Sequence, residues 1–321
     1  MSPRALVTGG AGFVGSNLCW ELSARGWDVV ALDDMSVGTF KNLQGFPGDV
    51  VAADVGDVSY WAPRVGKVDA VFHQAAITDT TVMDQRKMMR VNVEAFRDLL
   101  GWAAKAKVKK VVYASSAGTY GDQPVPQRED MTPKPLNVYG FSKAVMETVA
   151  ANAKGVKTVG LRYFNVFGPR EAHKEKYASM IWQLSLQMKA GRRPRVFEFG
   201  EQYRDHIYVK DVVEANVKAF EKAAPGVYNC CTGRRTDFNA VIAALNQTMG
   251  TNLAPEYFKN PYPFFQNETQ GDPAKARKAF GFAAQWTAER GIQDYIGRLP
   301  NGEEGSGTSS PYGSVGVSGV K

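Results

Sequence analysis

Cysteine and histidine are scarce in this chain, and their positions exclude two kinds of stabilisation. Of the 321 residues, three are cysteines and three are histidines. Cys230 and Cys231 are adjacent, and Cys19 lies in an apolar helical pattern, so the cysteines give no disulfide framework. None of the histidines has a Cys or His partner at the short spacings that metal sites use. We therefore expect neither disulfides nor a metal site.

Long hydrophobic runs are also missing. No window of the sequence approaches the roughly 20 consecutive apolar residues that a membrane-spanning helix needs. The first residues, SPRALVTGG, lack a basic segment followed by an apolar stretch and a cleavage site. The sequence therefore predicts a cytoplasmic protein that has no membrane partner.

The charge is unbalanced, with a formal net charge of +7. This excess of positive charge permits an anionic partner: nucleic acid, a membrane surface or a phosphorylated small molecule. The basic runs KAKVKK and KAGRRPR fit helix ends, where cations complement the helix dipole. No aromatic residues interleave with either run, so we expect no nucleic-acid partner and favour a phosphorylated small molecule.

Short apolar runs alternate with longer helical patterns through the first half of the chain. Runs such as ALVTG, VVALD, DAVFH and KVVYASS are apolar throughout, which is typical of parallel strands buried on both faces. This alternation predicts an α/β fold with a Rossmann-like doubly wound parallel sheet. The later pattern is mixed and predicts a smaller mixed α/β substrate-binding domain.

The same patterns suggest domain boundaries. Residues 1–166 are predicted to form the dinucleotide-binding domain, to which residues 205–232 return. Residues 167–204 and 233–300 are predicted to form the substrate-binding region. Residues 301–321 are rich in Gly and Ser without periodicity, so we expect a flexible tail.

The segment TGGAGFVGSNL directly follows the first predicted strand and opens a helix. It places Gly9, Gly12 and Gly15 where a tight turn and the free amides of a helix start can receive a pyrophosphate. The second strand ends in Asp33, where a carboxylate can accept the ribose hydroxyls; a plain polar turn is the alternative. Asp34 adds a negative charge without a neighbouring arginine for a 2′-phosphate. We therefore expect NAD as the cofactor, with NADP possible.

Two further strand ends are candidates for contact with this cofactor. Asp54 and Val55 follow the strand VVAAD, where they can bracket the adenine. Gln74, Ala75 and Ala76 follow the strand DAVFH and offer mostly small side chains where the cofactor passes closely.

The segments YASSAGTYG and VYGFSK carry the predicted chemistry. Tyr139 and Lys143 are four residues apart, so in a helix they share one face. The ammonium can then lower the pKa of the phenol and bind the cofactor ribose, which makes Tyr139 a general base for an alcohol. Ser116 ends the preceding strand and can hydrogen-bond the same oxygen. A chance surface pair is the alternative, but it does not explain the ordered glycine loop, Asp33 and serine.

These segments, together with HQAA, RYFNVFGPR and RDHIYVKDV, resemble landmarks of the extended short-chain dehydrogenase/reductases that act on nucleotide-sugars. The resemblance covers roughly residues 3–298. It implies that Tyr139, Lys143 and Ser116 are catalytic. Further cofactor-binding candidates are Phe13, Val14, Asn92, Phe164 and Val166. The substrate-binding candidates are Thr78, Ser116, Asn165, Lys174, Gln183, Phe197, Glu198, Arg204 and Phe265.

Within this family, KPLNVYGFSK, RYFNVFGPREAHK and the TDTT stretch most resemble the ADP-L-glycero-D-manno-heptose 6-epimerases. In that branch a tyrosine and a second lysine act on opposite faces of the carbon being inverted, and the second lysine falls on Lys174. The chain departs from the branch at Lys176, Gln183 and Phe265, where the branch has serine, histidine and tyrosine.

The resulting expectation is a nucleotide-sugar epimerase that uses transient oxidation and re-reduction with bound NAD(P). A UDP-hexose 4-epimerase, in which Tyr139 alone handles both proton transfers, is the enzyme alternative. A non-catalytic, nicotinamide-responsive binding protein is a remote one. The apolar helical patterns at 88–106 and 138–153 and the resemblance both suggest a homo-oligomer, a dimer or larger.

Overall fold

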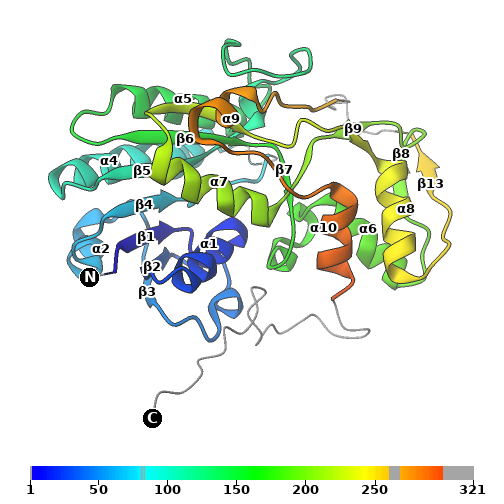
Figure 1. The fold of residues 1–321 in the computed structure, drawn as a ribbon, viewed down its shortest axis with the longest axis horizontal. Coiled ribbons are helices and arrows are strands. Elements are labelled where there is room, and N and C mark those ends of the chain that lie inside the picture. The colour runs from blue at the N-terminus through cyan, green and yellow to red at the C-terminus, as the bar shows by residue number, and fades with distance from the viewer. Residues whose placement is uncertain (1, 81, 83, 260–267, 299–321) are drawn as a thin grey trace.

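The computed structural model describes residues 2–80, 82, 84–259 and 268–298. The predicted tail at 301–321 and the candidate Phe265 lie outside the described residues. Strands and helices alternate in the first half of the chain, and Figure 1 shows the resulting sheet beside a separate group of helices.

A seven-stranded parallel sheet forms the centre, in the order β11-β6-β5-β4-β1-β2-β3. Its strands are β1 (Arg4–Thr8), β2 (Asp28–Asp33), β3 (Asp49–Ala52), β4 (Ala70–His73), β5 (Lys110–Ser116), β6 (Thr158–Tyr163) and β11 (Gly226–Cys230). Most of these strands are apolar throughout because both faces of the sheet are covered. From β1 to β3 successive strands are added on one side of the sheet, and from β4 onward they are added on the other side of β1. This confirms the doubly wound fold predicted from the sequence.

Helices cover the two faces, and side chains alternate between them. In β1, Ala5 and Val7 pack in one buried cluster with α1 and α7, whereas Leu6 packs in another with α4 and α5. The helices on the first face are α1 (Phe13–Ala24), α7 (Val209–Lys222) and α9 (Ala274–Phe280). Those on the second are α2 (Val58–Val65), α4 (Ala95–Lys105) and α5 (Val138–Asn152).

The single helix predicted over residues 88–106 is divided in the structure. A short helix, α3 (Gln85–Met89), passes through a π-helical turn, Arg90–Glu94, into α4. The turn contains Asn92, which is fully buried and donates a hydrogen bond to the hydroxyl of Ser142 on α5, 3.0 Å away. The irregular turn thus faces a polar contact that a continuous apolar pattern did not predict.

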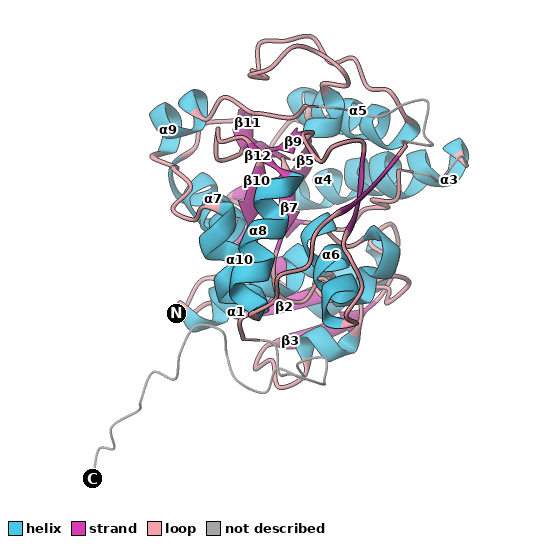
Figure 2. Cartoon of the chain, turned by 90° about the vertical axis from the view of Figure 1, so that its right-hand side faces the viewer, coloured by secondary structure: helices cyan, strands magenta, loops and turns pink. Residues whose placement is uncertain are grey.

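A third buried cluster lies beside the sheet and holds α6 (Met180–Lys189), α8 (Phe238–Met249) and α10 (Ala288–Ile296) together. Figure 2 shows these helices in front of the sheet when the molecule is turned by 90°. Three small two-stranded sheets accompany them. They are β7 (Asn165–Phe167) with β10 (His206–Tyr208), β8 (Arg195–Phe197) with β13 (Glu256–Phe258), and β9 (Tyr203–Arg204) with β12 (Thr236–Asp237).

The segments predicted to return to the main sheet do contact it, because α7 packs on the sheet and β11 pairs with β6. The division into domains remains a prediction. Among the described residues, none of the helices combines the length and apolar character that crossing a membrane requires. Nor does this part of the chain bring three metal-ligating side chains together.

Candidate active site

A cavity of about 630 Å³ opens at the carboxyl ends of β1, β2, β4, β5 and β6 and extends toward the third cluster. In doubly wound folds, ligands bind at this edge, where the strand order reverses. The sheet lines one side of the cavity, which we call the cofactor side. Residues from the small sheets and from α8 line the other, which we call the substrate side.

The glycine loop lies at the cofactor side, and its glycines are required by close packing. A Cβ added at Gly15 would lie 1.9 Å from the carbonyl oxygen of Gly9. Gly9 has φ +66°, and a Cβ there would lie 2.7 Å from the backbone nitrogen of Ala75. Glycine is therefore needed for the tight turn and close packing of this loop, and its contact with a pyrophosphate stays a prediction.

Asp33 lies at the end of β2, where its carboxylate is buried. It accepts hydrogen bonds from the backbone nitrogens of Ala11 and Met35, at 3.0 and 2.9 Å. Burial raises its pKa, although these two hydrogen bonds act in the opposite direction. Asp34 is exposed beside it and also lines the cavity. This carboxylate pair and the glycine loop fit the ribose and pyrophosphate of NAD.

The positive charges lie elsewhere in the cavity. Among the described residues that line it, the Lys and Arg side chains are Lys143, Lys174, Arg195 and Arg204. None of them belongs to β2 or to the turn after it, where Asp33 and Asp34 lie. The structure therefore presents carboxylates rather than a phosphate-binding cation at the predicted ribose position, which favours NAD over NADP.

Tyr139 and Lys143 lie in the first two turns of α5, next to Ser116 at the end of β5. The Lys143 ammonium donates a 2.8 Å hydrogen bond to the carbonyl of Ala114 and lies 5.9 Å from the centre of the Tyr139 ring. Burial lowers the pKa of Lys143 to about 7, while Glu147 acts to raise it.

The expectation of a lowered pKa for Tyr139 is wrong for this structure. Burial raises the pKa of Tyr139 and outweighs a hydrogen bond with Ser116 that lowers it. The physical reason is that the surrounding protein partly shields this half-buried phenol from water, which disfavours the phenolate. A neighbouring lysine four residues away was sufficient for the prediction, but the sequence could not show how deeply the tyrosine is buried.

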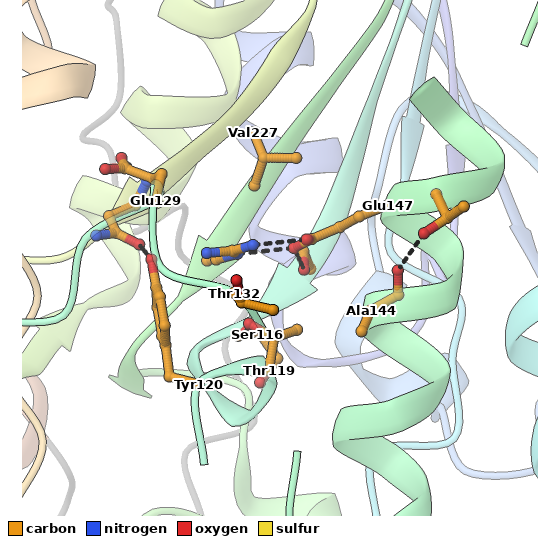
Figure 3. A network of polar contacts seen from close by, with 12 residues as sticks. Ser116, Thr119, Tyr120, Glu129, Thr132, Ala144, Glu147 and Val227 are labelled. Carbon is orange, nitrogen blue, oxygen red and sulfur yellow. Dashed lines mark hydrogen bonds and ion pairs between the residues drawn. The ribbon is translucent and has the colours of Figure 1, made fainter. Parts of the chain in front are cut away.

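A buried ion pair supports this helix from behind (Figure 3). Glu147, one turn after Lys143, accepts two hydrogen bonds from Arg162 at 2.8 and 2.7 Å and one from Ser115 at 2.5 Å. The guanidinium also lies 4.6 Å from the centre of the Tyr120 ring. This network joins α5, β5 and β6, so it fixes the catalytic candidates relative to the sheet.

Lys174 approaches the cavity from a different segment, residues 168–179, which we call the Lys174 loop. It includes the 3-10 turn Ala172–Tyr177. The fully buried Glu171 holds the loop, because its carboxylate accepts hydrogen bonds from Gly168 and from the backbone and hydroxyl of Ser179, at 3.1, 2.7 and 2.9 Å. Lys174 itself lines the cavity and lies 5.8 Å from the centre of the Phe13 ring.

The backbone of the Lys174 loop is strained on both sides of the lysine. Arg170 has φ 72° and Glu175 has φ 48°, in the left-handed region that non-glycine residues rarely adopt. Such conformations persist where the surrounding structure holds them, often at functional sites. Burial also lowers the pKa of Lys174, an effect that nearby Glu171 partly offsets. The lysine therefore loses its proton more readily than an exposed one.

Two asparagines connect the Lys174 loop to the cofactor side. The Asn17 amide on α1 donates to the carbonyl of Pro169 at 3.0 Å. The Asn42 amide donates to the carbonyls of Ala11 and Arg170 at 3.0 and 3.2 Å. The predicted cofactor loop and the loop with the second candidate acid or base are thus held by shared hydrogen bonds.

The substrate side contains Arg204, whose pKa burial lowers to about 10. The neighbouring Asp205 offers a carboxylate with which Arg204 could pair, but other residues donate hydrogen bonds to that carboxylate. It accepts hydrogen bonds from Thr232, Gly233 and Gly271 at 2.7 to 3.1 Å. Arg204 lines the cavity, where a guanidinium can bind phosphate oxygens.

Most of the predicted site residues meet in this one cavity. Those that line it are Gly9, Gly12, Phe13, Val14, Gly15, Asp33, Asp34, Asp54, Val55, Gln74, Ala75, Ala76, Thr78, Ser116, Tyr139, Lys143, Phe164, Asn165, Val166, Lys174, Phe197 and Arg204. Three predicted residues that the structure describes do not line it: Asn92, Gln183 and Glu198.

Local hydrogen bonds explain two of these three departures. Asn92 is turned toward the protein, where its side chain bonds the backbone nitrogen and carbonyl of Ile77 at 2.8 and 3.0 Å. It therefore shapes the wall of the cavity from behind. The Gln183 amide donates to the carbonyls of Lys176 and Ala178 at 3.1 and 2.8 Å, which holds the end of the Lys174 loop. Glu198 is exposed at a turn after β8.

Sequence reasoning missed several polar and aromatic side chains in the cavity. They include Tyr163, His173, Arg195, Gln202, His206 and Phe238. A signal existed for His206, which follows Arg204 by two positions, the spacing that puts side chains on one face of an extended strand. Tyr163 ends β6 of the central sheet, whereas Phe238 begins α8, whose position depends on the packing of the third cluster.

The parallel sheet and the residues that line its cavity are typical of dinucleotide-dependent α/β enzymes. A model of the family described as "NAD dependent epimerase/dehydratase family" matches residues 5–231. The chain belongs to this family. The predicted family, NAD cofactor and epimerase class are thereby confirmed.

Individual members of this family differ in how similar they are to the chain. The chain is 37% identical to an ADP-L-glycero-D-manno-heptose-6-epimerase of Alkalilimnicola ehrlichii, over 91% of this chain and 96% of that protein. The solved enzyme of this name from Helicobacter pylori is 41% identical, with a TM-score of 0.86 over 92% of this chain and 95% of the other. A UDP-glucose 4-epimerase from Thermotoga maritima, solved with UDP-glucose, is 30% identical, with a TM-score of 0.83 over 90% and 96% of the two chains.

Proposed function

We propose that this protein inverts a carbinol centre of a nucleotide-sugar, with ADP-L-glycero-D-manno-heptose or a near relative as its substrate. The observation that carries the proposal is that two candidate acid/base groups line one cavity from separate segments. Tyr139 comes from α5 and Lys174 from the Lys174 loop. When hydride returns to the opposite face of the carbon, the oxygen comes to lie in a new position, and a second acid/base group can protonate it there.

Tyr139 is proposed to take the proton from the reacting hydroxyl of one epimer, and to give it back when the reaction runs in reverse. Bound NAD supplies an acceptor and donor of hydride for the carbon that carries this hydroxyl. Ser116 hydrogen-bonds the phenol and so orients its oxygen. Lys143 places a positive charge near the ring, which favours the phenolate whenever the lysine is protonated.

Lys174 is proposed to transfer the proton on the opposite face. Burial lowers its pKa, so the neutral amine that can accept a proton is more accessible than in an exposed lysine. Glu171 and the strained loop backbone fix its position, and effective proton transfer requires a fixed distance to the reacting oxygen. Arg204 and Asn165 are proposed to hold the substrate diphosphate.

A UDP-hexose 4-epimerase is the second candidate, favoured by the likeness to the Thermotoga maritima enzyme. In that mechanism Tyr139 alone transfers both protons, and the oxidised sugar turns over in the site. Lys174→Met separates the two because it keeps the length of the side chain and removes the amine. A loss of turnover of about 10²-fold or more supports two groups, and a change below about threefold favours the 4-epimerase.

The direct test is to extract the nucleotides bound to purified protein and to assay ADP-heptose and UDP-hexose epimers side by side. We expect bound NAD and faster interconversion of the ADP-heptose epimers. Preferential turnover of UDP-hexoses would replace the substrate but keep the reaction. Bound NAD without hydride exchange on any nucleotide-sugar would instead revive the non-catalytic binding protein.

The predicted homo-oligomer and cytoplasmic location also remain proposals. Leu136 and Phe141, at the start of α5, are 56% and 52% exposed, which leaves apolar surface for a second copy. Sedimentation velocity of the purified protein tests this directly. A monomer at micromolar concentration would contradict the oligomer.

A further inference from the structure

The extended segment from β9 to β10 divides its side chains between two environments. Arg204, Asp205 and His206 are consecutive, so in an extended backbone the first and third face one way and the second the other. Asp205 faces the protein and is saturated by Thr232, Gly233 and Gly271. Arg204 and His206 both line the cavity.

His206 is held there without a hydrogen bond to any described part of the protein. The residue is 5% exposed, yet neither Nδ1 nor Nε2 has a partner. Its ring meets Phe167 and Phe238 edge to face, with centroids 6.3 and 6.1 Å apart. An unpaired buried polar group destabilises a fold, and a phenylalanine would fill these surroundings without that cost. The imidazole therefore has the features of a group reserved for a ligand.

The neighbours of His206 indicate which ligand chemistry it can meet. Arg204 lies two residues earlier on the same face, and Asn165 on β7 is paired directly with His206. Burial, together with the charge of Arg204, lowers the pKa of His206 to about 3. The ring is therefore neutral, with one nitrogen that donates a hydrogen bond and one that accepts. Beside an arginine, an anionic oxygen is the partner that such a donor fits best.

We propose that His206 donates a hydrogen bond to the diphosphate of the nucleotide-sugar, next to the guanidinium of Arg204. This inference rests on the proposed function, because it assumes a nucleoside diphosphate on the substrate side. The histidine thus binds the ligand and takes no part in proton transfer. Such binding also explains why a polar ring is kept between two phenylalanines.

The test compares ADP with adenosine by calorimetry on protein saturated with NAD, so that neither ligand can enter the cofactor half. His206→Phe keeps a ring of similar shape and removes both nitrogens. We expect the Kd for ADP to rise about 10- to 100-fold, the effect of losing a hydrogen bond to a charged group. The Kd for adenosine should stay unchanged. An unchanged Kd for ADP, or an equal loss for adenosine, overturns the proposal.

Stability gives a second readout that separates binding from a structural role. In His206→Phe the thermal midpoint should stay equal or rise, because an unpaired buried group is removed. A falling midpoint with unchanged ADP affinity would make the histidine structural and overturn the contact. Should this variant not fold, His206→Leu supports the same comparison, since it also lacks both nitrogens.

A double variant tests whether the two side chains hold the same group. If Arg204 and His206 bind one diphosphate, the losses in Arg204→Gln and His206→Phe should be less than additive when combined. Additive losses would place the histidine on another part of the ligand and overturn the assignment.

The failure of this inference can be told apart from that of the proposed function. If UDP binds and ADP does not, the proposed nucleotide is wrong, and UDP against uridine then tests His206 in the same way. If ADP binds through His206 but no epimer is converted, the reaction is wrong and the contact stands. If neither diphosphate binds, the inference and the proposed substrate class both fall.

Discussion

The two sides of the cavity are built on different principles. On the cofactor side, the buried charged groups have partners in the protein: Asp33 accepts two backbone hydrogen bonds, and Lys143 donates one to Ala114. On the substrate side, Gln202 and His206 contain buried side-chain atoms without a partner. Among the described cavity-lining residues, such atoms occur only in these two.

From this difference we expect some substitutions to affect stability and others to affect function. A group that is hydrogen-bonded to the protein is part of the fold, so its loss leaves a partner unpaired and lowers the free energy of unfolding. A buried group without a hydrogen-bond partner contributes little to the fold and is available to a ligand. Substitutions on the cofactor side should therefore reduce stability together with activity, whereas those on the substrate side should reduce activity alone.

The largest effect is expected where the two sides meet, at Tyr139. Tyr139→Phe removes only the hydroxyl that transfers the proton, so turnover should fall about 10³-fold or more. The fold should persist because the ring stays in place, and NAD should remain bound. Turnover and cofactor content are measured together, with Tyr60→Phe on the exposed surface of α2 as the control. Normal turnover in Tyr139→Phe would refute its role.

The second prediction concerns the ion pair behind the cofactor side. Arg162→Met leaves the buried carboxylate of Glu147 unpaired, and the free energy of unfolding should fall by about 3–5 kcal/mol. Urea titration measures this loss. Arg128→Met, which breaks an exposed pair with Asp130, provides the matched control and should leave stability unchanged. Equal effects in the two variants would show that burial does not decide the outcome.

Asn42 tests the connection between the two sides. Asn42→Ala removes the hydrogen bonds to Ala11 and Arg170, so the Lys174 loop loses one of its two attachments to the cofactor side and keeps the one through Asn17. We expect kcat to fall about tenfold with little change in KM, because misplacement of an acid/base group slows the chemical step. Steady-state kinetics measure both. Asn152→Ala, at the exposed end of α5, is the control, and a kcat equal in both variants would exclude the coupling.

The smallest effect should come from a residue that lies on neither side. Gly101 is exposed within α4, and a Cβ there would meet no atom within 4 Å. Gly101→Ala should stabilise the protein by about 0.5–1 kcal/mol and leave turnover unchanged, because alanine loses less backbone entropy in a helix. Thermal unfolding checks this baseline. A destabilised variant would mean that this surface is covered in solution.

More of the residues on the cofactor side than on the substrate side could be predicted from the sequence, and the reason is physical. Gly9, Gly15 and Asp33 were found because strand, loop and helix follow one another along the chain and fix their positions locally. Tyr139 and Lys143 were found because four residues of helix return to the same face. Asn92 was assigned to the cavity but bonds Ile77 from behind, since its direction depends on a π-helical turn.

The residues of the substrate side come from segments that are distant in sequence. His206 and Phe238 meet only because β10 pairs with β7 and α8 packs in the third cluster. Their spacing in the chain carries no sign of this contact. The raised pKa of Tyr139 likewise follows from burial in the folded chain, which its local sequence pattern does not show.

The sequence by itself determined the doubly wound fold, the glycine loop, the carboxylate at the end of β2 and the paired tyrosine and lysine, because each depends on short-range geometry. Only the tertiary structure decided how far Tyr139 and Lys174 are shielded from water, which hydrogen bonds hold the Lys174 loop, and that the imidazole of His206 lines the cavity without a partner in the described part of the chain. Burial and hydrogen-bond saturation are sums over many distant neighbours, and they exist only once the chain has folded.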